Sequence, residues 1–224
     1  MKIIVTTSNK YHHLLKIFVY LFNKNWSDKQ QVEIVGYDAP NFDLPNNFTF
    51  YSLGQQIGDA KNFTRDLRKY FEKQDHFFIW LFDDSFIRSV DFNKLEILQR
   101  LTSFNDLDSI GRINLSNHCR LQFHTGYDVI AGYRIIAQTQ ESKYRLSTQP
   151  SIWNKDFLLK YMKDDLTPWE FETQDSINDG WKVLGPEDAA VKHNEGVTKH
   201  DIFDYNLNGI LPEQIEEMKQ LGIL

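Results

Sequence analysis

Cysteine is almost absent from this chain of 224 residues, in which Cys119 is the only one. A single cysteine excludes an intramolecular disulfide and a four-cysteine zinc site. Proteins without disulfides are typical of reducing compartments. We therefore expect a fold held together by its apolar core, in a cytoplasmic protein.

Long hydrophobic runs are also missing. The apolar stretch from Leu14 to Phe22 is interrupted by Lys16, and it is shorter than the roughly 20 residues that a membrane span needs. The apolar start at residues 2–5 gives way to Thr-Thr-Ser-Asn, which is too short and too polar for a secretory signal. The sequence thus predicts a soluble chain with no membrane span.

Basic residues are in the minority, and several nucleotide-binding motifs are absent. The chain carries 31 Asp and Glu against 25 Lys and Arg, a net charge of -6, and has no basic stripe of the kind that nucleic-acid binding requires. It contains no Gly-x-Gly-x-x-Gly and no Gly-Lys-Ser/Thr phosphate loop, which argues against dinucleotide dehydrogenases and P-loop enzymes. Without a Gly-x-Ser-x-Gly elbow, a serine hydrolase is not indicated either.

The residues that are present predict one α/β domain covering residues 1–224. Hydrophobic residues make up 41% of the chain, enough for a sizeable core. In the first half, apolar runs alternate with amphipathic segments, which is typical of a mostly parallel sheet flanked by helices. Strands are expected at 2–7, 32–37, 48–53, 76–82 and 111–115, and helices at 11–26, 58–72 and 93–104.

The second half predicts a mixed arrangement instead. Strands are expected at 127–137 and 144–148 without a helix between them, and helices at 151–162, 169–180 and 212–221, the last after a loop-rich tail. We expect residues 1–115 to form a nucleotide-binding half, and residues 116–224 to form an acceptor-binding half with the C-terminal tail.

The sharpest chemical feature is the pair Asp83-Asp84 after the most apolar stretch of the chain. Ligands of open α/β sheets bind beyond the carboxyl ends of the strands, and carboxylates there suit Mg²⁺ or Mn²⁺ shared with substrate phosphates. Adjacent residues point to opposite sides, so we assign Asp84 to the metal and Asp83 to a ribose or an indirect contact. The alternative is that Asp-Asp-Ser only forms a turn.

A second acidic feature follows Thr167-Pro168-Trp169. Glu170 stands at the third position of a capping box that Thr167 begins, so it has a structural role available. Glu172 has none, and partial desolvation beside Trp169 and Phe171 would suit a general base. The alternative for both is that they are solvated acids favoured by the helix dipole.

Polar residues that follow the other strands are expected at the same edge of the sheet. Hydroxyls and acids there can hold a base and ribose, and cations can neutralise phosphate. His193, in a glycine-containing loop, is a candidate for a metal or a diphosphate, although a surface histidine is the plainer interpretation. The predicted nucleotide-site residues are Thr6, Thr7, Ser8, Asp38, Lys61 and Arg65.

With these residues in view, the chain resembles the GT-A class of nucleotide-sugar glycosyltransferases, in particular small single-domain bacterial and viral members. The resemblance covers roughly residues 1–200. It depends on three segments: TTSNKYHHLL, LFDDSF, and RLSTQPSIWNKDFLLKYMKDDLTPWEFE.

The resemblance implies a GT-A-like, Rossmann-like fold and a nucleoside-diphosphate sugar donor, with Mn²⁺ or Mg²⁺ held at an Asp-x-Asp-type motif. Here that motif reads Phe82-Asp83-Asp84, so its first acidic position is missing. It also implies that Glu172 or Glu170 deprotonates a hydroxyl acceptor, such as a glycan, in an inverting transfer. Gln149, Trp153 and Trp169 would line the acceptor side.

Two other functions stay open from the sequence. A nucleotidyltransferase or phosphohydrolase could use Asp83 and Asp84 for the same electrostatic reason. A carbohydrate-binding protein could keep the fold and lack the chemistry. The oligomeric state is open as well.

Overall fold

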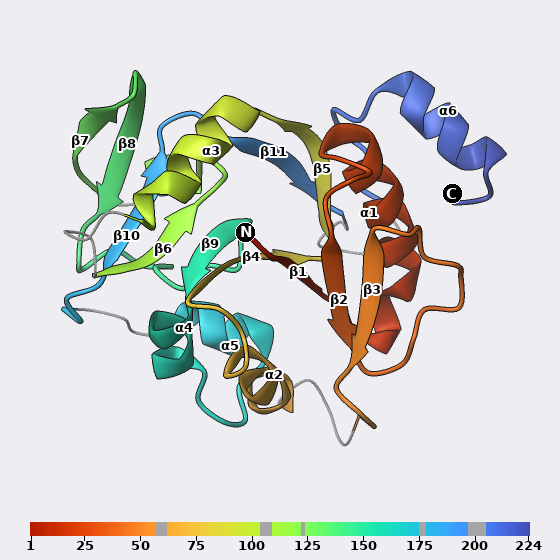
Figure 1. Ribbon diagram of the computed structural model, residues 1–224, viewed down its shortest axis with the longest axis horizontal. Helices are drawn as coiled ribbons and strands as arrows, with labels where there is room; N and C mark the ends of the chain where they lie inside the picture. The colour runs from red at the N-terminus through yellow and green to blue at the C-terminus, as the bar shows by residue number, and fades with distance from the viewer. Residues whose placement is uncertain (57–61, 104–108, 122–123, 175–177, 197–204) are drawn as a thin grey trace.

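In the computed structural model, a central mixed sheet lies between two layers of helices (Figure 1). The structure describes residues 1–56, 62–103, 109–121, 124–174, 178–196 and 205–224. Within them, nine strands form the main sheet in the order β3-β2-β1-β4-β9-β6-β10-β8-β7, and β11 pairs with β5 in a separate ribbon. No helix of these described ranges is long and apolar enough to cross a membrane.

Most of the strands follow apolar runs of the sequence, and β11 is an exception. In chain order they are β1 (Ile3–Thr6), β2 (Val32–Gly36), β3 (Phe48–Ser52), β4 (Phe77–Phe82), β5 (Ser85–Val90), β6 (Ile110–Asn114), β7 (His124–Ile130), β8 (Tyr133–Gln138), β9 (Ser151–Asn154), β10 (Lys182–Pro186) and β11 (Val191–Glu195). The helices are α1 (His12–Asn25), α2 (Phe63–Phe71), α3 (Phe92–Leu101), α4 (Lys155–Tyr161), α5 (Pro168–Thr173) and α6 (Pro212–Gln220).

The first half has the predicted architecture, except for β5, which the sequence did not indicate. The pairings among β3, β2, β1 and β4 are all parallel, and their order 3-2-1-4 matches the first four strands of the Rossmann order 3-2-1-4-5-6. α1 and α3 share one apolar cluster with one face of the sheet, and α2, α4 and α5 share a second cluster. The prediction of an α/β fold with a parallel part and a mixed second half is confirmed.

Five predictions of elements in the second half need correction. The expected single strand at 127–137 is a hairpin, because β7 ends at Ile130 and β8 begins at Tyr133 after a turn at Ala131 and Gly132, which both have positive φ. Residues 151–154 are a strand, β9, which lies antiparallel between β4 and β6, and only then does α4 begin. The expected strand at 144–148 is a turn, because Tyr144 adopts a left-handed conformation with φ of 56°. The expected helix at 169–180 ends at Thr173, and the expected loop-rich tail contains β10 and β11.

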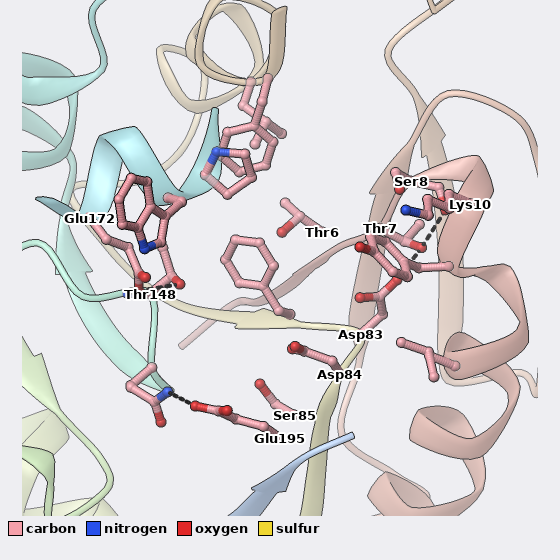
Figure 2. Close-up of a pocket in the computed structure, with 18 of the residues that line it drawn as sticks. Thr6, Thr7, Ser8, Lys10, Asp83, Asp84, Ser85, Thr148, Glu172 and Glu195 are labelled. Atoms are coloured by element: carbon pink, nitrogen blue, oxygen red, sulfur yellow. Dashed lines mark hydrogen bonds between the residues drawn. The ribbon is translucent and has the colours of Figure 1, made fainter. Parts of the chain in front are cut away.

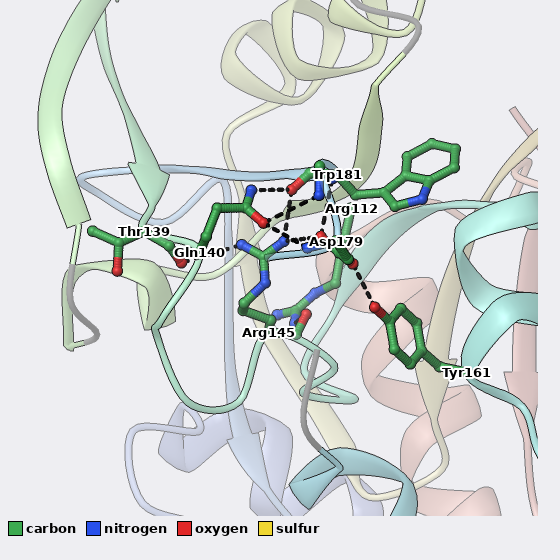
Figure 3. A network of polar contacts seen from close by, with 8 residues as sticks. Arg112, Thr139, Gln140, Arg145, Tyr161, Asp179 and Trp181 are labelled. Carbon is green, nitrogen blue, oxygen red and sulfur yellow. Dashed lines mark hydrogen bonds and ion pairs between the residues drawn. The ribbon is translucent and has the colours of Figure 1, made fainter. Parts of the chain in front are cut away.

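A buried ion pair fixes the segment that leads to the site. Arg145 and Asp179 are both almost inaccessible, and the guanidinium lies 3.0 Å from the carboxylate. Arg145 also donates to the carbonyls of Thr139 and Trp181, while Tyr161 donates to Asp179 (Figure 3). Because these groups satisfy one another, the chain is held in place immediately before residues 147–149.

A second buried arginine also forms hydrogen bonds to this segment. Arg112, on β6, donates to the carbonyl of Arg145 at 2.8 Å and to the hydroxyl of Ser151 at 3.0 Å. Its guanidinium lies over the ring of Trp153. The conformation of residues 145–151 is therefore set by the sheet rather than by local sequence preference.

Candidate functional site

The site begins where β1 and β4 end side by side. These strands are parallel neighbours, with Thr6 opposite Phe82, so the residues that follow them meet at one edge of the sheet. Thr7 donates a hydrogen bond to the Asp83 carboxylate at 2.5 Å. From β1 the chain continues to β2 on one side, while β4 lies on the other, which makes this edge the crevice where ligands of such sheets bind.

A cavity of about 550 Å³ opens at this edge (Figure 2). The structure brings nine of the predicted site residues to its lining: Thr6, Thr7, Ser8, Asp83, Asp84, Gln149, Trp169, Glu172 and His193. Lys10, Thr148 and Glu195 also line it and were missed from the sequence. The sequence alone does not indicate that Glu195 lies at the cavity, because only the pairing of β11 with β5 places it opposite Ser85.

Asp83 is the buried member of the acidic pair. Only 4% of its surface is exposed. Burial, and then the neighbouring charge of Asp84, raise the pKa of the Asp83 carboxyl well above its usual range, and the hydrogen bond from Thr7 partly opposes this. The Asp83 carboxylate is thus held within the protein by its hydrogen bond from Thr7.

Asp84 lines the cavity as well, and it is the less buried member of the pair. Its side chain points into the space between Glu195 and the end of β4 (Figure 2). Burial first, and then the charges of Glu195 and Glu172, raise the pKa of Asp84 to about 6. The site therefore concentrates negative charge around one carboxylate, and a cation would relieve it.

Glu172 is held by one of its two carboxylate oxygens. Its Oε1 accepts hydrogen bonds from the amide and the hydroxyl of Thr148, at 2.5 and 2.7 Å. Within the described residues, no hydrogen bond reaches its Oε2. Glu170 instead completes the predicted capping box, because its carboxylate accepts from the Thr167 amide at 2.9 Å.

His193 lies in a strand rather than in the expected loop. It belongs to β11, and its Nε2 lies 2.7 Å from Oε1 of Gln149. Burial, and then the neighbouring His118, lower the pKa of His193 to about 4. Gln149 also donates to Glu195 at 3.3 Å, so this amide bridges two side chains of β11.

Four of the predicted residues lie elsewhere, and one of them is Glu170, whose carboxylate completes the capping box of α5. Trp153 is fully buried in the core against Trp80 and Phe171, so its assignment to the acceptor side is wrong. Asp38 is exposed and accepts from Asn9 at 2.5 Å, and Arg65 pairs with Asp66 at 3.2 Å.

Lys61 lies outside the described residues. It stays a prediction for the nucleotide site.

The donor set of the cavity suits a hard divalent cation only in part. Asp84 and Glu195 supply carboxylate oxygens, the ligands that Mg²⁺ and Mn²⁺ prefer. Across the described ranges, no three His, Cys, Asp or Glu side chains come together as a complete metal cage. Mg²⁺ commonly uses one or two carboxylates and takes its other ligands from water and substrate phosphates, so the residues fit a metal that binds together with a substrate.

Comparison with known proteins gives similarity in structure alone. No family model matches the chain, and no curated protein matches it. Among solved structures, a cytidylyltransferase from Leptospira borgpetersenii is 11% identical with a TM-score of 0.49, over 99% of this chain and 94% of that one. HddC from Yersinia pseudotuberculosis is 12% identical with a TM-score of 0.44, over 99% of both chains.

An active-site mutant of the galactosyltransferase LgtC is 13% identical with a TM-score of 0.41, over 83% of this chain and 72% of that one. With identities of 11–13% and TM-scores below 0.5, these similarities concern the chain path and carry no assignment of activity.

Proposed function

We propose that this protein transfers a sugar from a nucleoside-diphosphate sugar to a hydroxyl acceptor, with Mn²⁺ or Mg²⁺ as cofactor. The observation that carries the proposal is the arrangement at the end of β4. A buried Asp83 is anchored by Thr7, and the carboxylate of Asp84 faces a cavity of about 550 Å³ at the crevice between β1 and β4. The resemblance of the sequence to GT-A glycosyltransferases is the reason for proposing that the transferred group is a sugar.

In this proposal the donor lies along the carboxyl ends of β1 and β4. The hydroxyls of Thr7 and Ser8 and the ammonium of Lys10 line this side of the cavity and would contact the nucleotide and its diphosphate. Asp84, with Glu195 beside it, would hold the metal. When bound, the metal neutralises the diphosphate and the carboxylates at once and assists departure of the diphosphate.

Glu172 is the residue that we assign as general base. Thr148 fixes the carboxylate through Oε1, which leaves Oε2 to accept a proton from the acceptor hydroxyl. As that proton moves to Oε2, the hydroxyl oxygen bonds to the anomeric carbon. The bond from this carbon to the diphosphate oxygen breaks, and its electron pair leaves with the diphosphate. A single displacement of this kind inverts the anomeric centre.

Trp169 is placed to contact the acceptor. It lies at the start of α5, it lines the cavity, and 69% of its surface is exposed. An exposed aromatic face beside hydroxyl and carboxylate side chains suits a sugar ring, whose C–H groups pack on it. Gln149, the residue after Thr148, would donate hydrogen bonds to the hydroxyl groups of the acceptor or accept hydrogen bonds from them.

The test is a donor-cleavage assay on the purified protein. UDP-, GDP-, CMP- and dTDP-sugars are incubated with and without Mn²⁺, and free nucleotide is measured. We expect metal-dependent release from one donor class, and a loss of about 100-fold or more in Glu172→Gln, with Glu170→Gln as the matched control. Pyrophosphate formed from a nucleoside triphosphate and a sugar phosphate would instead show a nucleotidyltransferase, and binding without turnover would show a carbohydrate-binding protein.

A further inference from the structure

A second cavity, of about 670 Å³, adjoins the first one. It lies between β5, the start of α3, β11 and the segment that follows β6. Gln149 and His193 line both cavities, and they are hydrogen-bonded to each other at 2.7 Å. The wall between the two spaces therefore includes one amide and one imidazole, and Gln149 directly follows the threonine that holds Glu172.

The two cavities carry opposite charge. Among the described residues, the first is lined by the acids Asp83, Asp84, Glu172 and Glu195 and by one cation, Lys10. The second is lined by Arg88, Lys94 and Lys192 against Asp91 and Asp188. The described lining of the second cavity therefore has an excess of one positive charge, although the chain as a whole has a net charge of -6.

One of these aspartates already has a partner. Asp91 caps α3 by accepting a hydrogen bond from the backbone amide of Lys94 at 3.0 Å. Its second oxygen lies 3.8 Å from the Lys94 ammonium, which is beyond hydrogen-bond distance. The aspartate thus forms an ion pair with the lysine ammonium but accepts none of its three N–H donors.

Lys94 is the buried cation of this cavity. Only 8% of the residue is exposed, and lysine is seldom buried without a partner. Its ammonium donates to the carbonyl of Asp188 at 3.0 Å and lies 5.2 Å from the ring centre of Tyr133. An ammonium has three N–H donors, so one protein hydrogen bond leaves donors for an anion in the cavity.

Lys192 adds a second ammonium at the mouth of the cavity. A bulge in β11 falls between Lys192 and His193, and bulges re-aim side chains out of strict alternation, which explains why consecutive residues line the same space. Lys192 is exposed, and its ammonium makes no hydrogen bond to the described residues. It is therefore available to a ligand.

We propose that the second cavity binds a phosphate or carboxylate group of the acceptor, so that the substrate is an anionic sugar rather than a neutral one. This inference rests on the proposed transferase function. The acceptor would place its anionic group near Lys94 and Lys192 and extend its hydroxyl past Gln149 to Glu172. The acidic first cavity would repel such a group, so the separation of charge also fixes the orientation of the acceptor.

The test compares the binding of three probes to the full chain by calorimetry: glucose, glucose 6-phosphate and glucuronic acid. We expect both anionic sugars to bind at least about tenfold more tightly than glucose. Lys192→Glu should weaken their binding about tenfold, because it replaces an attraction by a repulsion, and should leave the binding of glucose unchanged. Lys182→Glu is the matched control, since Lys182 is an exposed lysine on β10, outside both cavities.

Equal affinities for the three probes, or equal effects of the two lysine variants, would overturn the inference. Inorganic phosphate that binds as tightly as glucose 6-phosphate would also overturn it, because the cavity would then recognise an anion and not an acceptor. Nucleoside diphosphate binding with Mn²⁺ is measured on the same samples. Its absence would contradict the proposed function, whereas its presence with no preference for anionic sugars would contradict only the present inference.

Discussion

Replacing Asp84 by asparagine should stabilise the free protein at neutral pH. The pKa of Asp84 is raised from 3.8 to about 6 in the folded chain, so the folded state binds this proton more tightly than the unfolded state does. Ionised Asp84 therefore destabilises the fold above pH 6, and this penalty vanishes below the unfolded pKa. A shift of about two units corresponds to about 3 kcal/mol, which asparagine of the same shape would not incur.

The assay is urea unfolding of wild type and Asp84→Asn at several pH values between 3.5 and 8, without metal. We expect the variant to exceed the wild type by up to about 3 kcal/mol at pH 7, and the difference to shrink towards zero as the pH falls from 6 to below 4. The substitution also removes the repulsion between the charges of Asp84 and Asp83, which should stabilise the variant further.

Asp164→Asn, at an exposed turn, is the matched control for the loss of one charge. A variant that is less stable than the wild type at pH 7 would refute the reasoning. It would mean that favourable contacts, and not uncompensated charge, surround the Asp84 carboxylate.

The remaining predictions concern the base, two tryptophans and a buried ion pair. Glu172→Gln should keep nucleotide binding in calorimetry and lose about 100-fold or more of turnover; unchanged turnover would exclude it as the base. Trp153→Ala should cost about 3–5 kcal/mol in urea unfolding, whereas Trp169→Ala should change stability little and weaken acceptor binding. Asp179→Ala should cost about 3–5 kcal/mol, because it leaves the Arg145 charge buried without its partner; a cost near zero would contradict this.

The first half of the fold was predictable because each of its units is local. β1 and β4 are short runs of buried apolar residues, and the polar residues that follow them meet because parallel neighbours end at one edge. The pairing of Thr7 with Asp83 follows from that register. Sequence reasoning therefore predicted that the acidic pair and the hydroxyls beside it would lie at one edge of the sheet.

The second half was less predictable because tertiary pairing overrides the local pattern. Ile152, Phe157 and Tyr161 have helical spacing, but residues 151–154 form a strand because they pair with both β4 and β6. Asn154 was the available signal, since its side chain caps α4 by accepting from the amide of Asp156. Trp153 is consequently in the core and not at the acceptor side.

β11 left no comparable signal. Its sequence VKHNE has no alternating apolar pattern, and it becomes a strand by pairing with β5. That pairing carries His193 and Glu195 to the cavity. Neither their contact with Gln149 nor the charge that Glu195 places near Asp84 could be inferred before the pairing was known.

The most direct test of the central claim is the thermal shift produced by nucleoside diphosphates in the wild type and in Asp84→Asn, each with and without Mn²⁺. A ligand at 100 times its dissociation constant adds about 2.7 kcal/mol of stability. We expect one of UDP, GDP and dTDP, or CMP as the monophosphate analogue, to stabilise the wild type only when Mn²⁺ is present, and to leave Asp84→Asn unchanged. Stabilisation that is equal in the two proteins, or that needs no metal, would contradict a metal-dependent donor site at Asp84.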